Sequence, residues 1–335
     1  MGGTVRLLLG GDAMLGRGVD AVLRERGAAY PFAPLAPLLA TADLRFVNLE
    51  CAITPRRTRF QGAPKAFYFR ADPVAADALA AAGVDLVGLA NNHALDAGIE
   101  GLRDTFDALA QRHIRWVGAG ADLDAAAAPC VLDCKGQRLG ILACCDHQPD
   151  FAAAAGRPGI HYLDLGNPRD RQALLDRTAA LASRVDHAVV SLHWMPNWVP
   201  AIAPERRRLA RELVASGARV VWGHSPHHVL GAEWMGGSAV LYSTGDLLDD
   251  YALDPHYRND RQCLYLLELE PHRLASLHAH PLELEYARTV PAGAAARRWL
   301  ARRLAAACRP LGSRVRRDGE RFAILPAAAP GTRRA

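Results

Sequence analysis

An apolar stretch that ends abruptly in polar side chains most limits what this chain can fold into. Residues 84–90 (Val-Asp-Leu-Val-Gly-Leu-Ala) are typical of a short buried strand, and Asn91, Asn92 and His93 follow it at once. Because such a strand is covered along its length, its polar end must emerge at an edge or in a cleft. There Asn92 can offer a carbonyl oxygen to a metal ion, and His93 can carry a proton near neutral pH.

The same pattern recurs along the chain. We predict further strands that end in polar side chains over residues 5–12, 44–50, 186–193 and 219–224. The polar residues at or just after all five strand ends are Asp12, Asn48, Glu50, Asn92, His93, His193, His224 and His227. One such histidine is usually a satisfied polar residue, and a lone Asp suits a helix N-cap. Recurrence at five strands instead predicts a common site, because ligands bind beyond the carboxyl ends of strands in open α/β sheets.

The predicted donors favour transition metals. Carboxylates, an amide oxygen and several imidazoles suit Mn, Fe or Zn and suit Ca poorly. Roughly six donors favour two divalent ions over one, and Glu50 is our choice for a carboxylate shared between them, as in two-metal hydrolases.

Composition sets the broad class. The chain has 335 residues, of which 50% are hydrophobic and 22% charged, as in an ordinary globular α/β domain. Its formal net charge is +5, yet residues 293–335 hold eleven Arg against one Asp and one Glu, so the basic balance belongs to the tail. No run reaches the roughly 18 apolar residues that span a bilayer. The N-terminal residues are expected to lead into the first strand and not to form a signal peptide. We therefore expect a cytoplasmic protein without a membrane anchor.

Six motifs, in order along the chain, resemble the CapA family of poly-γ-glutamate capsule-synthesis proteins, which is related to calcineurin-like metallophosphoesterases. They are Gly-Asp-Ala-Met-Leu-Gly-Arg (11–17), Asn-Leu-Glu (48–50), Ala-Asn-Asn-His-Ala-Leu-Asp-Ala-Gly (90–98), His-Trp (193–194), Gly-His-Ser-Pro-His-His (223–228) and Tyr-Ser-Thr-Gly-Asp (242–246). The resemblance implies a four-layer α/β/β/α sandwich with a dinuclear site between its loops.

The resemblance also implies roles for individual residues. The metal ligands would be Asp12, Glu50, Asn92, His193, His224 and His227, and His93 would donate a proton to the leaving group. His228 is adjacent to His227, and we prefer His227 as the ligand. Met14 stands where the wider phosphoesterase pattern has a metal-binding His, so one ion would lack a nitrogen ligand.

Other residues are candidates for contact with substrate or with the ligands. This set consists of Arg17, Asn48, Asn91, His228 and Asp246. Arg17 can hold an anion with two hydrogen bonds, or it is a surface residue. Asp246 begins an acidic loop that borders the cleft or is simply solvated. Trp194 and Trp198 flank His193 and either wall the pocket or pack in the core.

These observations predict one main domain and two functions from different classes. Residues 1–290 are expected to form the CapA-like metallophosphoesterase domain, and residues 291–335 an Arg-rich helix followed by a frayed tail. The leading hypothesis is a hydrolase in which water activated by two metal ions attacks a phosphoester or an amide, with His93 as general acid. The alternative is a non-catalytic metal protein that binds polyglutamate, a polyanion. The substrate is expected to be an anionic small molecule or polymer. No nucleic-acid recognition module is visible, and the sequence does not define the oligomeric state.

Overall fold

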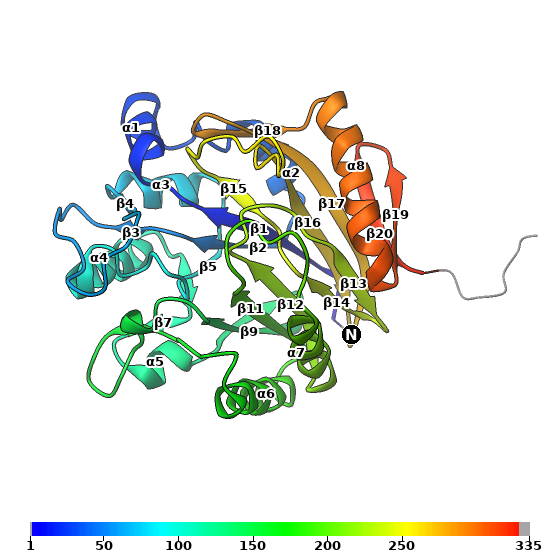
Figure 1. Ribbon diagram of the computed structural model, residues 1–335, viewed down its shortest axis with the longest axis horizontal. Helices are drawn as coiled ribbons and strands as arrows, with labels where there is room; N and C mark the ends of the chain where they lie inside the picture. Colours follow the sequence, from blue (N-terminus) through cyan, green and yellow to red (C-terminus); the bar gives the residue numbers. More distant parts are fainter. Residues whose placement is uncertain (1, 328–335) are drawn as a thin grey trace, which may run out of the picture.

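The structure is a computed structural model that describes residues 2–327, and it contains two large β-sheets (Figure 1). The larger sheet runs in the order β19-β20-β17-β16-β1-β2-β5-β6, with β15 beside β1 and β18 beside β17. Strands β1, β2, β5 and β6 are parallel, and β16 joins β1 in the antiparallel sense. The strands are β1 (Val5–Ala13), β2 (Leu44–Leu49), β5 (Leu86–Gly88), β6 (Arg115–Val117), β15 (Asp246–Leu248), β16 (Arg261–Glu270), β17 (Arg273–Glu285), β18 (Arg288–Pro291), β19 (Ser313–Asp318) and β20 (Arg321–Pro326).

The second sheet runs in the order β13-β14-β12-β11-β9-β8, with β14, β12, β11 and β9 parallel to one another. At its edge, β8 and β9 form an antiparallel hairpin that turns at Lys135-Gly136. These strands are β8 (Cys130–Cys134), β9 (Gln137–Cys145), β11 (His187–His193), β12 (Ala218–His224), β13 (Ala232–Met235) and β14 (Ser238–Leu241). Two short pairs complete the strands: β3 (Ala52–Ile53) with β4 (Arg70–Ala71), and β7 (Ala119–Gly120) with β10 (Gly159–Ile160).

Helices cover the outer faces of both sheets (Figure 1). Helices α3 and α4 add buried Leu79 and Leu102 to the core around the larger sheet, and α6 and α7 add Leu174 and Leu213 to a separate core against the second sheet. The helices are α1 (Arg17–Arg26), α2 (Ala36–Leu39), α3 (Val74–Ala81), α4 (Gly98–Ala110), α5 (Leu123–Ala127), α6 (Pro168–Ala182), α7 (Pro204–Ala215) and α8 (Ala294–Cys308).

The two sheets pack face to face through a shared apolar core. Phe46 of β2 meets Trp222 of β12 edge-on, with ring centroids 4.5 Å apart. All seven residues of β11 are buried, as expected of a parallel strand covered on both sides. The predicted four-layer α/β/β/α sandwich is confirmed.

Residues 239–246 are divided between the two sheets. Strand β14 ends at Leu241 in the second sheet, and β15 begins at Asp246 in the larger one. The chain crosses over at Gly245, whose φ of +71° lies in the left-handed region that favours glycine. A side chain at Gly11 would collide with the Gly245 carbonyl oxygen, 1.8 Å from its Cβ position. This close approach sets Asp246 directly beside Asp12 in the β1–β15 register.

The segment after the predicted terminal helix also differs from the prediction. The helix is present as α8, but the residues that follow form β19 and β20 instead of a frayed tail. Strand β20 pairs with β17 and buries Phe322 and Ile324, so alternate apolar side chains hold it in the larger sheet. Residues 328–335 of the predicted tail lie outside the described residues. Within residues 2–327, no helix has the length and apolar character needed to cross a membrane.

Candidate metal centre

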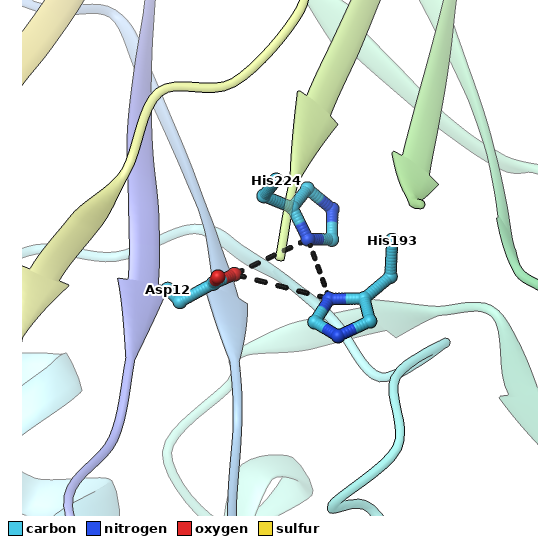
Figure 2. A group of neighbouring side chains, drawn as sticks. All are labelled: Asp12, His193 and His224. Atoms are coloured by element: carbon cyan, nitrogen blue, oxygen red, sulfur yellow. Dashed lines mark hydrogen bonds and ion pairs between the residues drawn. The ribbon is translucent and has the colours of Figure 1, made fainter. Parts of the chain in front are cut away.

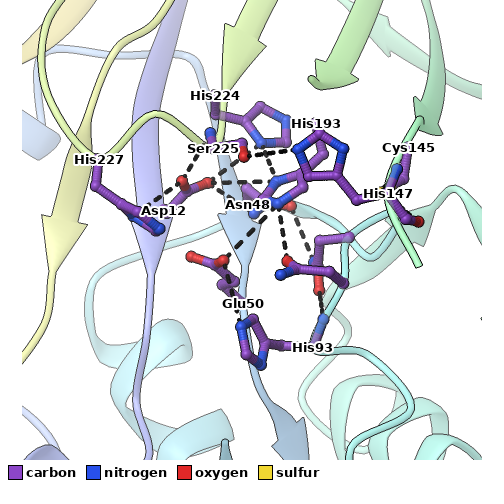
Figure 3. A network of polar contacts seen from close by, with 12 residues as sticks. Asp12, Asn48, Glu50, His93, Cys145, His147, His193, His224, Ser225 and His227 are labelled. Atoms are coloured by element: carbon purple, nitrogen blue, oxygen red, sulfur yellow. Dashed lines mark hydrogen bonds and ion pairs between the residues drawn. The ribbon is translucent and has the colours of Figure 1, made fainter. Parts of the chain in front are cut away.

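Strand ends from the two sheets meet at one place. Asp12 lies near the end of β1, while His193 and His224 end the neighbouring strands β11 and β12 and are partners in register. Glu50 follows β2, and Asn92 lies beyond β5. The structure therefore brings these strand ends together as predicted, and Figure 3 shows Asp12, Glu50, His193 and His224 pointing toward one another from separate strands.

The first donor group contains two imidazoles (Figure 2). His224 Nδ1 lies 3.2 Å from Asp12 Oδ1, and His193 Nδ1 lies 4.0 Å from the same oxygen and 2.9 Å from His224 Nδ1. Asn92 Oδ1 approaches the opposite side of the His193 ring, 2.9 Å from Nε2. Asp12, His193 and His224 are each 1% exposed, so their donor atoms face a site shielded from bulk water.

The second donor group is rich in carboxylates. It consists of Asp12, Glu50, His227 and Asp246, all buried, with one ligand atom of each within 4.8 Å of the others. His227 Nδ1 lies 2.9 Å from Asp246 Oδ1 and 3.9 Å from Asp12 Oδ2. Because Asp12 belongs to both groups, its two oxygens can serve two neighbouring cations. Asp246, expected to contact substrate or support the ligands, lies within this donor group.

The donor groups fit cations because three of their carboxylate oxygens lack other partners in the described chain. Within residues 2–327, neither carboxylate oxygen of Glu50 accepts a hydrogen bond, and Asp246 Oδ2 is also without a partner. The nearest nitrogens to Glu50 Oε1 belong to His193 at 3.8 Å and His93 at 3.9 Å. A buried carboxylate left unpaired is costly, and a cation is the usual means of compensation.

The electrostatics of the centre agree with this fit. Burial raises the pKa of Glu50 well above its ordinary value, and the nearby charge of Asp12 adds to the effect. Burial also holds the pKa of His193 well below its ordinary value, which leaves the neutral imidazole that metals bind. Burial would lower the pKa of His227, but the carboxylates of Asp246 and Glu50 raise it to about 10. In the absence of a cation, a proton on His227 therefore balances part of the negative charge.

Neighbouring groups fix the orientation of Asp12. Asn48 Nδ2 donates to Asp12 Oδ1 at 2.7 Å, and the Ser225 backbone N–H donates to Asp12 Oδ2 at 2.9 Å. Asn91 donates in turn to Asn48 Oδ1 at 3.1 Å and accepts from the His93 backbone N–H at 3.0 Å. Asn48 and Asn91, two of the predicted supporting residues, thus connect Asp12 to the loop that carries His93.

His93 lies next to the second donor group, and Asp96 orients its ring from the side away from Glu50. Its Nδ1 lies 2.5 Å from Asp96 Oδ2, and since a carboxylate accepts, the ring proton belongs on Nδ1 and Nε2 faces Glu50. The Lys65 ammonium donates to Asp96 and to the Asn92 carbonyl oxygen. Burial lowers the pKa of His93 to about 4, although Asp96 opposes this. Neither Asp96 nor Lys65 was predicted to belong to the site. Asp96 could have been found from its position three residues after His93, within the motif of residues 90–98.

His228 and Met14 both lie outside the donor groups. His228 turns away from Asp12, with Nε2 3.0 Å from the Val199 carbonyl oxygen, and its ring stacks near Trp198. The geometry therefore brings His227, and not His228, to the centre. Met14 is fully buried, and its sulfur accepts a hydrogen bond from the Gly16 N–H at 3.2 Å.

Arg17 lies at the rim of a pocket of about 460 Å³ that opens onto His93 and His227. Its Nε is 3.4 Å from Asp250 Oδ2. Trp198 lines the same pocket, whereas Trp194 is buried and donates to the Tyr242 carbonyl oxygen. Of the two tryptophans that flank His193, one therefore walls the pocket and the other packs in the core.

Two packed sheets with carboxylate, amide and imidazole donors at their strand ends define a four-layer α/β/β/α protein with a candidate metal centre. The family model described as bacterial capsule synthesis protein PGA_cap matches residues 6–251. The chain therefore belongs to this family, which includes CapA, as the motifs predicted.

Known relatives agree with this membership. A probable polyglutamine synthesis accessory protein of Mycobacterium tuberculosis is 32% identical over 97% of this chain and 97% of its own length. The PGA biosynthesis protein CapA of Bacillus subtilis is 28% identical over 72% of this chain and 62% of its own length. A hypothetical protein of Thermus thermophilus with a solved structure aligns at 16% identity and a TM-score of 0.48, covering 83% of this chain and 99% of that one.

Proposed function

We propose that this protein is a metal-dependent hydrolase of the CapA type, linked to poly-γ-glutamate or capsule metabolism. The observation that carries the proposal is the convergence of buried, unpartnered carboxylate oxygens with neutral imidazole at the ends of strands from two sheets. The names of the relatives in B. subtilis and M. tuberculosis support the link to capsule or polyglutamate synthesis.

Two divalent transition metal ions (Mn, Fe or Zn) would occupy chemically unequal positions. Asp12 with His193 and His224 offers two nitrogens and a carboxylate, with the Asn92 oxygen beside His193 as a further donor. Asp12 with Glu50, His227 and Asp246 offers mainly oxygen. In the second group Asp246 would supply the ligand that Met14 does not. Glu50, with both oxygens unpartnered and Oε1 3.8 Å from His193 Nε2, would be the carboxylate shared between the ions.

When bound, the ions would lower the pKa of water and draw charge from the oxygen of a phosphoester or amide. The chain supplies the proton transfer. His93 Nε2 faces the centre, and Asp96 holds the ring in orientation through Nδ1. An anionic substrate beside His93 would raise the pKa of the imidazole and load Nε2 with a proton. As water adds and the bond to the leaving oxygen or nitrogen breaks, that proton passes to the leaving atom.

The test is turnover of phosphoesters and γ-glutamyl amides by the Mn²⁺-loaded protein and its His93→Ala variant. Turnover should fall by roughly 10²–10⁴-fold, the usual contribution of a general acid. The metal content by mass spectrometry should remain near two ions per chain. His272→Ala is the matched control, because His272 is exposed and sits in the turn between β16 and β17.

Two results would count against the proposal. Full activity in His93→Ala would remove the assigned acid. A protein that binds two ions but turns over no member of the panel, while it binds polyglutamate in a salt-sensitive manner, would support the non-catalytic polyanion-binding alternative.

A further inference from the structure

The pocket beside the metal centre has an aromatic and apolar wall. Phe67, Phe69, Trp198, Tyr251 and Leu253 line it. Phe67 is 60% exposed and Leu253 is 55% exposed, and they are two of the four large hydrophobic side chains exposed within the described residues. Exposed apolar side chains that gather at a pocket are typical of a ligand-binding surface.

The aromatic wall leads from solvent to the predicted general acid. Phe67 stacks on Phe69 with centroids 6.2 Å apart and an interplanar angle of 22°. Phe69 stacks on His93 at 4.0 Å and 25°, and Tyr251 lies 5.8 Å from Phe69 on another side. A group held against this wall therefore lies on the side of the centre where His93 would protonate a leaving atom.

The charge of the pocket limits the ligand further. Arg17 is the one Lys or Arg among its lining residues in the described chain, and the Asp254 carboxylate lines the same pocket. The Arg17 guanidinium lies 5.8 Å from the Phe67 centroid and 5.7 Å from that of Phe69. Arg17 can hold a single anionic substituent on a ligand that lies against the aromatic wall.

We infer that the substrate carries a planar aromatic ring on its leaving group, with at most one anionic substituent within reach of Arg17. The inference rests on the proposed hydrolase function, since the metal centre must hold the scissile group. The ring would stack against Phe67 and Phe69, while the scissile bond lies between His93 and the donor groups. Phe67 and Leu253 would then select the leaving group, and His93 would protonate it.

The experiment separates binding from turnover by using analogues that cannot be hydrolysed. Benzylphosphonate carries a ring where a leaving group would be, and ethylphosphonate lacks it. Calorimetric titration of the Mn²⁺-loaded protein should show benzylphosphonate binding about tenfold more tightly, from the added apolar burial and ring contact. Phe67→Ala should weaken benzylphosphonate binding by roughly two- to tenfold, the range for one aromatic contact. Ethylphosphonate binding should stay within about twofold, since no ring is lost.

The control and the outcomes keep the two proposals distinct. Leu253→Ala should also weaken benzylphosphonate selectively, whereas Leu123→Ala, an exposed leucine in α5, should not. Equal affinity for the two phosphonates, or an equal effect of Phe67→Ala on both, would overturn the inference and leave the hydrolase proposal intact. Selective binding of benzylphosphonate without hydrolysis of any aryl or alkyl ester would instead remove the hydrolase and leave an aromatic-binding site.

Discussion

Replacing Glu50 by Gln should change stability in opposite directions without and with metal. In the metal-free protein, the buried carboxylate lacks a hydrogen-bond partner within residues 2–327, and burial together with the charge of Asp12 raises its pKa. A raised carboxyl pKa means that stability falls as pH rises above the unfolded value near 4.5, because the unfolded chain releases the proton first. At pH 7.5, removing this unpaired group should recover about 1–3 kcal/mol.

The expected shift in melting temperature follows from the length of the chain. An unfolding entropy of about 2.1 cal/mol/K per residue gives roughly 0.7 kcal/mol/K here, so the metal-free variant should melt about 1.5–4 °C above wild type. With free Mn²⁺ at a hundred times its dissociation constant, each ion stabilises wild type by about 2.7 kcal/mol, or about 4 °C. The variant lacks the shared carboxylate and should lose most of this gain.

Scanning calorimetry after dialysis against EDTA, and again with excess Mn²⁺, measures both effects. Glu25→Gln is the matched control, since the Glu25 side chain is 72% exposed. It should change the free energy of unfolding by no more than about 0.5 kcal/mol, with or without Mn²⁺. If Glu50→Gln lowers the melting temperature equally in the two conditions, Glu50 acts through packing alone and the metal assignment fails.

Two further predictions concern a second carboxylate and a buried histidine. Asp246→Asn should reduce the bound metal from two ions per chain toward one by mass spectrometry, whereas Asp250→Asn, four residues on and paired with Arg17, should retain two; unchanged stoichiometry in Asp246→Asn would exclude Asp246 as a ligand. Burial lowers the pKa of His161 to about 4, although its Nδ1 lies 2.7 Å from the Ala143 carbonyl oxygen. Stability should therefore fall as pH drops from 6.5 toward 4, because in that range only the unfolded chain takes up the proton. Urea unfolding should show a loss of about 2 kcal/mol at pH 5 that His161→Gln avoids; an identical pH slope in the variant would refute this.

The sequence predicted those parts of the site that depend on local pattern. Apolar runs defined the strands, and the residue after each run identified Asp12, His193 and His224, because parallel strands present their carboxyl ends at the same edge. It could not predict that Asp246 begins a strand in the other sheet, since that depends on the crossover at Gly245. Nor could it place Lys65, whose ammonium reaches Asp96 from a loop far along the chain.

Strands β19 and β20 were not predicted from the sequence, for a different reason. Arg314, Arg316 and Arg317 of β19 are exposed, and their charge conceals the apolar pattern of Val315, Phe322 and Ile324. A period of two is informative only when the partner strand is known, and that partner, β17, lies about forty residues earlier.

Backbone conformation shows how the fold holds the donors of the candidate centre in place. Ser225 has φ of +102° and His227 has φ of +61°, conformations that cost of order 1–3 kcal/mol each in residues other than glycine. Both residues act on the centre, since the Ser225 N–H donates to Asp12 and the His227 ring contacts Asp246. A loop that carries this strain must be held by its surroundings, here the end of β12 and the carboxylates it faces. Part of the cost of orienting these donors therefore falls on the folding of this loop.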